Sequence, residues 1–406
     1  MTPSQGEKKQ VLVSEAERML TQRLIPFWER LRDNRFGGYT GRVGYDLKAD
    51  PKADKGCILN SRILWFFSTA AMTLHSTALL DDAHHAYEFL KDHCFDAEEG
   101  GVFWSVHYDG SVCDPTKHTY NQAFAIYALA AYYRASGDAG AKDMAFSLYR
   151  MIEERCTDAN GYLEAFDRRF RPIPNEKLSD NTALMAKGLV AERTMNTLLH
   201  VFEGYSGLYE ASHDETVGKS LRQILSVFLD SVYNPEKHRQ EVFFDKNMHS
   251  LLDMHSYGHD IEASWLLDWG CSLLGDRDLS RRVQEMDSSL AREVYRSAYR
   301  KHSVWNEDVE GRPDKTRVWW VQAESVVGFL NEYQKHPLCT EYRQAAWDVW
   351  KYIGKYLVDP RKGSEWFWQV DDNGRPAEKP IVEPWKCPYH NGRMCFEIIR
   401  RGIDAP

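Results

Sequence analysis

Residues 256–265 read Ser-Tyr-Gly-His-Asp-Ile-Glu-Ala-Ser-Trp and bring together groups that can do chemistry. If this stretch is helical, His259, Glu262 and Trp265 lie about one turn apart and share one face. A histidine can exchange a proton near neutral pH, a carboxylate can hold it by a hydrogen bond, and an indole can pack on a sugar ring. A single histidine at a helix start is more often a cap or a packed surface group, so its surroundings must decide.

Comparable residues recur at the predicted starts of five other apolar helices. Within a helix the paired residues are three or four positions apart, so both can point into one cavity. Charged and amide groups are costly to bury without partners, which favours a shared site over six separate coincidences. The residues at the six predicted starts are Arg62; Tyr120; Asn196 and His200; His259 and Glu262; Trp320 and Glu324; and His390 and Arg393.

A repeated unit places these helix starts: an amphipathic helix, a short glycine and aromatic strand, then a more apolar helix. The aromatic residues of the short strands, Tyr39, Phe103, Tyr162, Phe243, Trp305 and Phe367, are 64, 59, 81, 62 and 62 residues apart. Helical hairpins of this kind must stack to bury their apolar faces. We therefore predict one all-α domain over residues 1–406: a closed (α/α)6 barrel of six helical hairpins, with short β-strands in the connecting loops and the second helix of each pair inside.

Local signals predict the boundaries of several elements. Ser14 followed by Glu17 is a capping-box pattern, which predicts a first helix from Ser14 to about Asn34. The second helix is predicted over 61–74, and residues 1–12 are predicted to be a poorly ordered tail. The long third interval, of 81 residues, contains a polar insertion over 168–193, which we expect to be a loop.

Composition excludes several classes of partner. The net charge of -9 is mild, and Lys and Arg are dispersed, so nucleic acid is not expected as a partner. No apolar run approaches the ~18 residues that cross a bilayer, and residues 1–20 lack a hydrophobic signal core. Eight cysteines without a C-x-x-C pair do not indicate disulfides. We expect a cytoplasmic protein, a monomer or weak homodimer, with no membrane partner.

Two chemistries fit the inward histidines, and a neighbouring cysteine offers a third. His255 and His259 with Glu262 could hold a metal ion, but their spacing straddles a glycine and does not define a firm three-ligand geometry. Cys387 near His390 could be a nucleophile, although nothing in the sequence around it indicates activation. Two bases, His259 and His390, could instead move a proton from one face of a carbon to the other, which is epimerisation or isomerisation.

The motifs around these positions resemble those of a known family. They are Ile58–Trp65, Gln122–Leu129, Met195–Thr197, Gly258–Leu267, Trp319–Glu324 and Trp385–Arg393. In combination they resemble the N-acylglucosamine 2-epimerase superfamily over about residues 25–401, and among its branches the cellobiose 2-epimerases most. One departure is visible, because the family often has Met-Asn-Thr-His-Leu-His where Leu198 here replaces the first histidine.

The resemblance implies a barrel without cofactor or metal and a reducing sugar as the small-molecule substrate. It implies reversible C2 epimerisation of the reducing-end glucose of cellobiose or lactose through ring opening and an enediolate. His390 and His259 would be the acid/base pair, and His200, Arg62 and Asn196 would hold the C1 and C2 oxygens. The remaining substrate-binding residues would be Tyr120, Glu262, Trp320, Glu324, Trp385 and Arg393.

Other functions of the same residues stay open at this point. A sister activity is mannose 2-epimerisation or aldose-ketose isomerisation of a monosaccharide. An inverting glycoside hydrolase would use Glu262 and Glu324 as two carboxylates about 6.5 to 9.5 Å apart. A sugar-binding module without catalysis is the third alternative, which three inward histidines disfavour.

Overall fold

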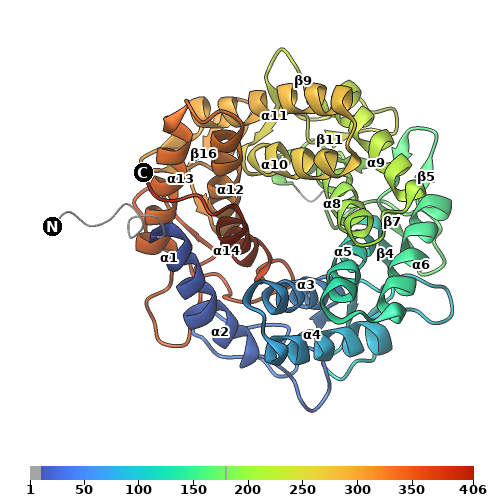
Figure 1. Ribbon diagram of the computed structural model, residues 1–406. Coiled ribbons are helices and arrows are strands. Elements are labelled where there is room, and N and C mark those ends of the chain that lie inside the picture. Colours follow the sequence, from blue (N-terminus) through green and yellow to red (C-terminus); the bar gives the residue numbers. More distant parts are fainter. Residues whose placement is uncertain (1–10, 179–180) are drawn as a thin grey trace.

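Two concentric rings of helices surround one axis in the computed structural model, which describes residues 11–178 and 181–406 (Figure 1). The inner ring consists of α3 (Cys57–Leu74), α5 (Thr119–Ser136), α8 (Met195–Ser212), α10 (Tyr257–Leu274), α12 (Trp319–Lys335) and α14 (Tyr389–Arg401). The outer ring consists of α1 (Val11–Met19) with η1 (Leu20–Leu24) and α2 (Ile25–Glu29), α4 (Thr77–Phe89) with η2 (Leu90–Cys94), α6 (Ala139–Arg155), α9 (Glu215–Val227) with η3 (Phe228–Val232), α11 (Arg277–Ser297), and α13 (Thr340–Tyr352) with η4 (Ile353–Leu357).

The ring is closed, as predicted. Each inner helix contacts the next, and α14 contacts both α3 and α1. Side chains also join the first outer helix to the last: Trp350 Nε1 donates to Glu15 at 2.6 Å, and Arg23 donates to the carbonyl of Asp359 at 2.7 Å. The fold is therefore an (α/α)6 barrel with the second helix of each hairpin inside.

Small residues let the inner helices pack closely. At Gly204 of α8 a Cβ atom would lie 2.6 Å from the carbonyl oxygen of Ala123 on α5, so only glycine permits this approach. The inner helices are buried around most of their circumference, whereas the outer ones bury one face and expose the other.

One inner helix corrects an expectation about apolar runs. By length and composition α3 could cross a membrane, with a mean hydropathy of 1.2 over 18 residues. Most of it (78%) is buried inside the barrel, which is the position of a core helix. The prediction that no apolar run approaches this length was wrong, because a helix surrounded by protein has the same composition as one surrounded by lipid.

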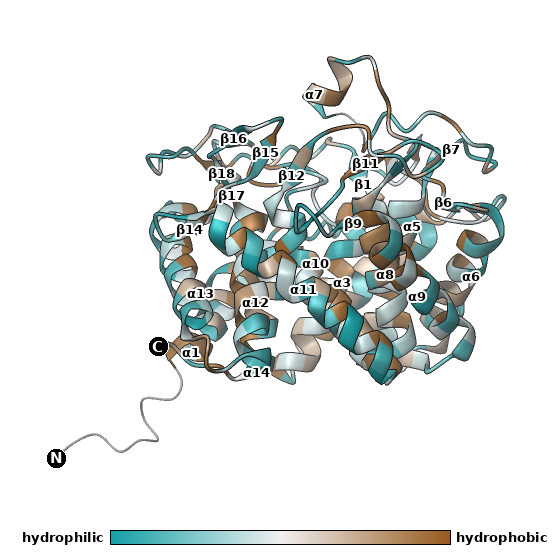
Figure 2. Cartoon of the chain, turned by 90° about the horizontal axis from the view of Figure 1, so that it is seen from above, coloured by the Kyte–Doolittle hydropathy of each residue, from teal (hydrophilic) through white to brown (hydrophobic). Residues whose placement is uncertain are grey.

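Short strands in the loops link neighbouring units at one end of the barrel (Figure 2). The strand before an inner helix pairs with the loop of the next unit: β1–β2, β4–β7, β8–β11, β12–β15 and β17–β18. A bridge between Val43 and Val382 joins the last loop to the first. The strands are β1 (Lys55–Gly56), β2 (Ser105–Val106), β3 (Val112–Asp114), β4 (Lys117–His118), β5 (Thr157–Asp158), β6 (Gly161–Tyr162), β7 (Ala165–Phe166), β8 (Arg193–Thr194), β9 (Tyr233–Asn234), β10 (Arg239–Gln240), β11 (Phe243–Phe244), β12 (Met254–Ser256), β13 (Tyr299–Arg300), β14 (Ser303–Val304), β15 (Glu307–Val309), β16 (Arg312–Asp314), β17 (Arg317–Val318) and β18 (Gln369–Val370).

Several predicted boundaries differ from the structure. Ser14 lies inside α1, which is already helical at Val11, and the first outer helix ends at Glu29 rather than near Asn34. Residues 1–10 of the predicted tail lie outside the described residues, while Leu12 is helical and buried. The inner helix α3 begins at Cys57 instead of Ser61. The 168–193 insertion is mainly loop but includes α7 (Thr182–Met185).

Candidate active site

A cavity of about 360 Å³ lies at the strand-bearing end of the barrel. The starts of the inner helices supply most of its wall, because all six run in the same direction and present their first turns at this end. The residues that line it are Arg62, Tyr120, Lys177, Leu178, Asn196, His200, His259, Glu262, Trp319, Trp320, Trp368, Trp385 and His390. All but two of the predicted site residues are among them, the exceptions being Glu324 and Arg393.

His390 is held at the start of α14 by a carboxylate behind it. Its Nδ1 is 2.8 Å from Oε1 of Glu324, on the neighbouring inner helix α12. Because an ionised carboxylate only accepts, this contact places the proton on Nδ1 and leaves the Nε2 lone pair as a base. Glu324 had been predicted to line the sugar site, but it lies behind the cavity and orients His390 instead.

His200 is held in the same way from within its own helix. Its Nδ1 is 2.8 Å from Oε2 of Glu203, one turn further along α8. The ring of Tyr120 meets the His200 ring edge to face at 5.0 Å between centroids. His200 therefore also presents Nε2 as its remaining ring nitrogen.

His259 is hydrogen-bonded to a hydroxyl group instead of a carboxylate, and this partner does not select one tautomer. Its Nδ1 is 2.7 Å from the hydroxyl oxygen of Ser256, which can accept a proton from the ring or donate one to it. Both tautomers of His259 are therefore compatible with the site, whereas the carboxylate partners of His200 and His390 each select one.

Trp320 brings the two predicted catalytic histidines into one neighbourhood. Its ring centroid lies 4.8 Å from that of His259 and 5.4 Å from that of His390. Gly258 makes this arrangement possible, since a Cβ atom there would lie 2.5 Å from the Trp320 ring. A side chain at position 258 would clash with Trp320, which explains the glycine before His259.

Arg62 is a buried cation whose charge is not neutralised by a carboxylate within the described residues. It donates to the hydroxyl of Tyr120 at 2.8 Å and stacks on Phe124, with its guanidinium carbon 4.1 Å from the ring centroid. Its Nε is buried without a partner. A desolvated, unpaired cation next to a polar cavity is suited to stabilise an anion that forms there.

The Cys387 thiol lies behind Arg62, with 3.9 Å between Sγ and a guanidinium nitrogen. Cys387 is fully buried, and this burial raises the pKa of its thiol. It does not line the cavity. The nucleophile hypothesis is therefore not supported by its position or by its protonation.

Arg393 lies one layer below the histidines, does not line this cavity, and binds three acids at once. Its guanidinium donates to Glu203 and Glu262, and to Glu324 at 2.7 Å. Tyr389 donates to Glu203 in the same layer. Arg393 was predicted to bind substrate, but it is fully buried below the histidines and instead fixes the acids that orient them.

Burial shifts the pKa values of the site in opposite directions. Desolvation lowers the pKa of His259 to about 3 and that of His390 well below its ordinary value, Arg393 and Arg62 adding to the latter shift. Desolvation and the charge of Glu324 raise the pKa of Glu262 to about 8. At neutral pH both histidines are therefore neutral bases and Glu262 is protonated.

The positions of the side chains do not fit the hydrolase hypothesis or the metal hypothesis. Oxygens of Glu262 and Glu324 come within 4.8 Å of each other and both accept from Arg393. That is too close for an inverting pair, which needs room for a water molecule between about 6.5 and 9.5 Å. For the predicted metal trio, His255 turns to Asp260, its Nε2 lying 2.8 Å from that carboxylate, and away from His259.

Comparison with known proteins agrees with this site. The family model described as N-acylglucosamine 2-epimerase (GlcNAc 2-epimerase) matches residues 37–392. The chain belongs to the N-acylglucosamine 2-epimerase family. It is 49% identical over 403 residues to a cellobiose 2-epimerase of Eubacterium cellulosolvens, covering 95% of this chain and 98% of that protein.

Solved structures agree with the fold of this N-acylglucosamine 2-epimerase family member. A sugar epimerase from a ruminal bacterium superposes with a TM-score of 0.94 at 48% identity, covering 97% of this chain and 100% of the other. A D-mannose isomerase superposes with a TM-score of 0.81 at 16% identity, covering 98% of this chain and 100% of the other. The second likeness concerns the fold alone.

Sequence reasoning missed several residues of this family member's site. Glu203 is three positions after His200 on the same helix, so the spacing that revealed the other pairs could have found it. Lys177 and Trp368 reach the cavity from loops, where no periodicity indicates direction. Leu198, the departure from the family pattern, lines a separate small cavity together with Thr197 and Val227.

Proposed function

We propose that this chain catalyses reversible C2 epimerisation of the reducing-end glucose of β-1,4-linked disaccharides. Cellobiose would give glucosyl-mannose and lactose would give epilactose. The carrying observation is the pair of neutral histidines, His259 and His390, each held through Nδ1 and each in contact with Trp320 in one cavity. The similarity to cellobiose 2-epimerases supports the choice of substrate.

The reaction needs a base and an acid. Ring opening makes the C1 aldehyde, which acidifies the hydrogen on C2. One histidine takes that proton through Nε2, the electrons of the C2–H bond form a C1–C2 double bond, and negative charge moves to the C1 oxygen. The other histidine takes up a proton from water as the negative charge develops and delivers it to C2 from the opposite face, and the first histidine later releases its proton to water. General acid–base catalysis of this kind contributes about 10²- to 10⁴-fold in rate.

The negative charge that develops during the reaction also favours protonation of the histidine that acts as the acid. Both histidines rest as neutral bases because burial lowers their pKa values. An enediolate anion between them raises the pKa of the neighbouring imidazole and favours its protonated form. The acidifying carbonyl belongs to the substrate, so these steps use groups of the sugar, side chains of this chain and protons exchanged with water.

Arg62 and Asn196 supply the polar surroundings of the enediolate. Arg62 is a buried cation without a carboxylate partner among the described residues. The side-chain oxygen of Asn196 is also buried without a partner. Such groups cost stability in the empty protein, and a bound sugar with its hydroxyls and its developing charge would satisfy them.

Aromatic rings and a protonated acid would recognise the sugar rings. Trp385 lines the cavity, with its ring 5.9 Å from that of Tyr120 between centroids. Glu262 carries a proton at pH 7 because its pKa is raised to about 8, and its Oε2 is buried without a partner. It can therefore donate a hydrogen bond to a sugar oxygen, which an ionised carboxylate cannot do.

Incubation with cellobiose, lactose, mannose and N-acetylmannosamine in deuterated water, followed by NMR, tests this proposal. We expect the cellobiose and lactose products to be 2-epimers with deuterium at C2. A fructose-type product would instead indicate aldose-ketose isomerisation, and turnover of mannose alone would indicate a monosaccharide epimerase. An epimer without deuterium would exclude proton exchange with water through the histidines.

A further inference from the structure

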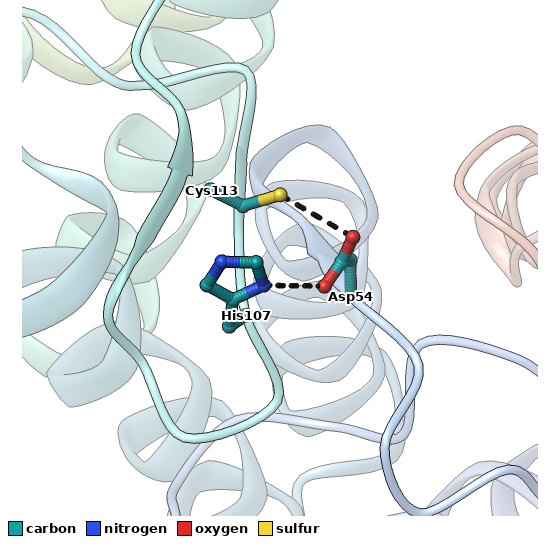
Figure 3. Close-up of side chains that lie close together, drawn as sticks. All are labelled: Asp54, His107 and Cys113. Carbon is teal, nitrogen blue, oxygen red and sulfur yellow. Dashed lines mark hydrogen bonds and ion pairs between the residues drawn. The ribbon is translucent and has the colours of Figure 1, made fainter.

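A second cluster of reactive side chains lies outside the barrel axis, on the sheet β1–β2–β3. Asp54 precedes β1, His107 follows β2, and Cys113 lies in β3. Figure 3 shows the imidazole and the thiol both directed at the Asp54 carboxylate. His107 Nδ1 is 2.8 Å from Oδ1, and Cys113 Sγ is 3.3 Å from Oδ2.

The register of the sheet explains this convergence. Lys55 pairs with Val106 in the antiparallel ladder, so Asp54 and His107 are the next residues opposite each other. The β2–β3 hairpin then brings Cys113 alongside, next to the pair of Ser105 with Asp114. The cluster is thus built on a hydrogen-bonded framework and does not depend on one flexible loop.

Of the eight cysteines, only Cys113 and Cys339 are not buried. Cys113 is also the only one in a cluster of His, Cys, Asp or Glu whose ligand atoms all lie within 4.8 Å, among the residues that the structure describes. We propose that Asp54, His107 and Cys113 form a binding site for one zinc ion, with water as the fourth ligand. The site is separate from the catalytic cavity, and nothing in the proposed reaction uses it.

The ligand chemistry favours zinc over harder cations. Thiolate, imidazole and carboxylate are the three protein ligands of zinc, at about 2.0 to 2.3 Å in tetrahedral geometry. Calcium and magnesium prefer oxygen alone. The ligand atoms lie close enough for small side-chain rotations to bring one atom of each residue to a common centre, and the partly exposed position leaves room for water.

The other cluster of possible ligands, Glu262, Glu324 and His390, is different. Arg393 already donates to both of its carboxylates, and a cation placed there would face the guanidinium. That cluster also contains no sulfur, which makes the two sites distinguishable by spectroscopy.

Zinc binding would release the thiol proton. In the metal-free protein the Cys113 thiol donates its proton to Asp54. Formation of the zinc–sulfur bond replaces this proton, which leaves to solvent.

Cobalt(II) provides the test, because a thiolate ligand adds a near-ultraviolet charge-transfer band to the visible bands of a tetrahedral ion. Chelator-treated full-length protein in a thiol-free reductant is titrated with cobalt and then with zinc. We expect one equivalent of cobalt to produce the sulfur band and one equivalent of zinc to abolish it. Cys113→Ser should remove the band, and His107→Asn should weaken zinc binding at least about tenfold.

Cys339→Ser is the matched control, since it removes the other cysteine that is not buried and should leave both signals unchanged. Circular dichroism confirms that each variant is folded. The proposal is overturned if wild-type protein shows no sulfur band, or if the band persists in Cys113→Ser. It is equally overturned if His107→Asn binds zinc as tightly as wild type.

Discussion

Two cavities enter the barrel from opposite ends, and their sizes are similar while their polar groups are not. The cavity at the strand-bearing end measures about 360 Å³, and the one at the other end about 430 Å³. The second is formed by the later turns of the inner helices and includes aromatic residues such as Trp65 and Trp269. Volume and aromatic lining therefore do not identify the active site.

The difference lies in how charge is compensated. At the second cavity Arg134 pairs with Glu210 and Arg400 with Glu397, so each cation has its own carboxylate. At the first cavity Arg62 has no such partner among the described residues, and Asn196 and Glu262 each carry a buried oxygen without a hydrogen bond. Unpaired polar groups are destabilising, so their concentration at one end indicates where a polar ligand completes the site.

The largest expected effect comes from exchanging a histidine at each end. His390→Ala should lower the epimerisation rate by about 10²- to 10⁴-fold, because it removes a proton-transfer group. His75→Asn at the second cavity should leave the rate within about twofold, since it touches no group of the first cavity. Steady-state kinetics on cellobiose compares them, and a loss of rate in His75→Asn would refute the distinction between the ends.

Arg393 lies between the two cavities and tests what separates them. Arg393→Met should lower the free energy of unfolding by about 3 to 5 kcal/mol, because Glu203 and Glu324 would lose the cation that balances their charge and protonated Glu262 would lose a hydrogen-bond donor. Denaturant unfolding at pH 7 measures this change. A variant as stable as wild type would mean that the buried acids are neutral without Arg393.

A cation at each end gives the next comparison. Arg62→Met should lower kcat by about 10²- to 10³-fold, because the enediolate loses an oriented positive charge. Arg400→Met removes a cation already paired with Glu397 and should change kcat by less than about twofold. Equal losses in both variants would show that overall charge, and not local orientation, supports the reaction.

The smallest effect concerns pH and stability. The folded pKa of His259, about 3, is below the unfolded value near 6.5, so the unfolded chain binds more protons as pH falls. The stability that neutral His259 contributes is present above pH 6.5 and decreases by about 1.4 kcal/mol per pH unit below it. Glu164, with its pKa raised to about 7 by burial, acts in the opposite direction, since its contribution is lost as pH rises.

The difference between wild type and His259→Gln isolates the histidine from these opposing groups. Between pH 6.5 and 4.5 the free energy of unfolding of the variant should fall less steeply than that of wild type. Parallel curves in chemical denaturation would show that His259 titrates normally in the folded protein.

Local sequence signals predicted the fold well because helix periodicity and capping depend on residues that are close together in the chain. The residue pairs Gly137–Asp138, His213–Asp214 and Gly275–Asp276 separate inner from outer helices. Each first member ends a helix in the left-handed conformation, and each aspartate accepts from the next helix's first turn. The prediction that the helix begins at Ser14 was wrong. Leu12 is already helical and buried, so the capping-box pattern at Ser14 lies inside the helix.

The roles within the site were less predictable. Helical spacing correctly directed His200, His259 and His390 to one cavity. The same spacing could not separate residues that touch this cavity from those one layer below it, so Glu324 and Arg393 were predicted to bind sugar. Which of two inward residues lies deeper depends on the height of its helical turn relative to the turns of the neighbouring helices. Spacing within one helix does not give this height.

By itself, the sequence determined six hairpins, the inner face of each, and the set of polar residues gathered at one end, because these follow from periodicity and caps within single helices. Tertiary structure alone decided how those residues divide the work. Arg393 joins Glu203, Glu262 and Glu324 from three other helices, and this layer fixes the proton on Nδ1 of His390 and His200. Protonation depends on burial and on charges that are distant in sequence, and these come together only when the ring closes.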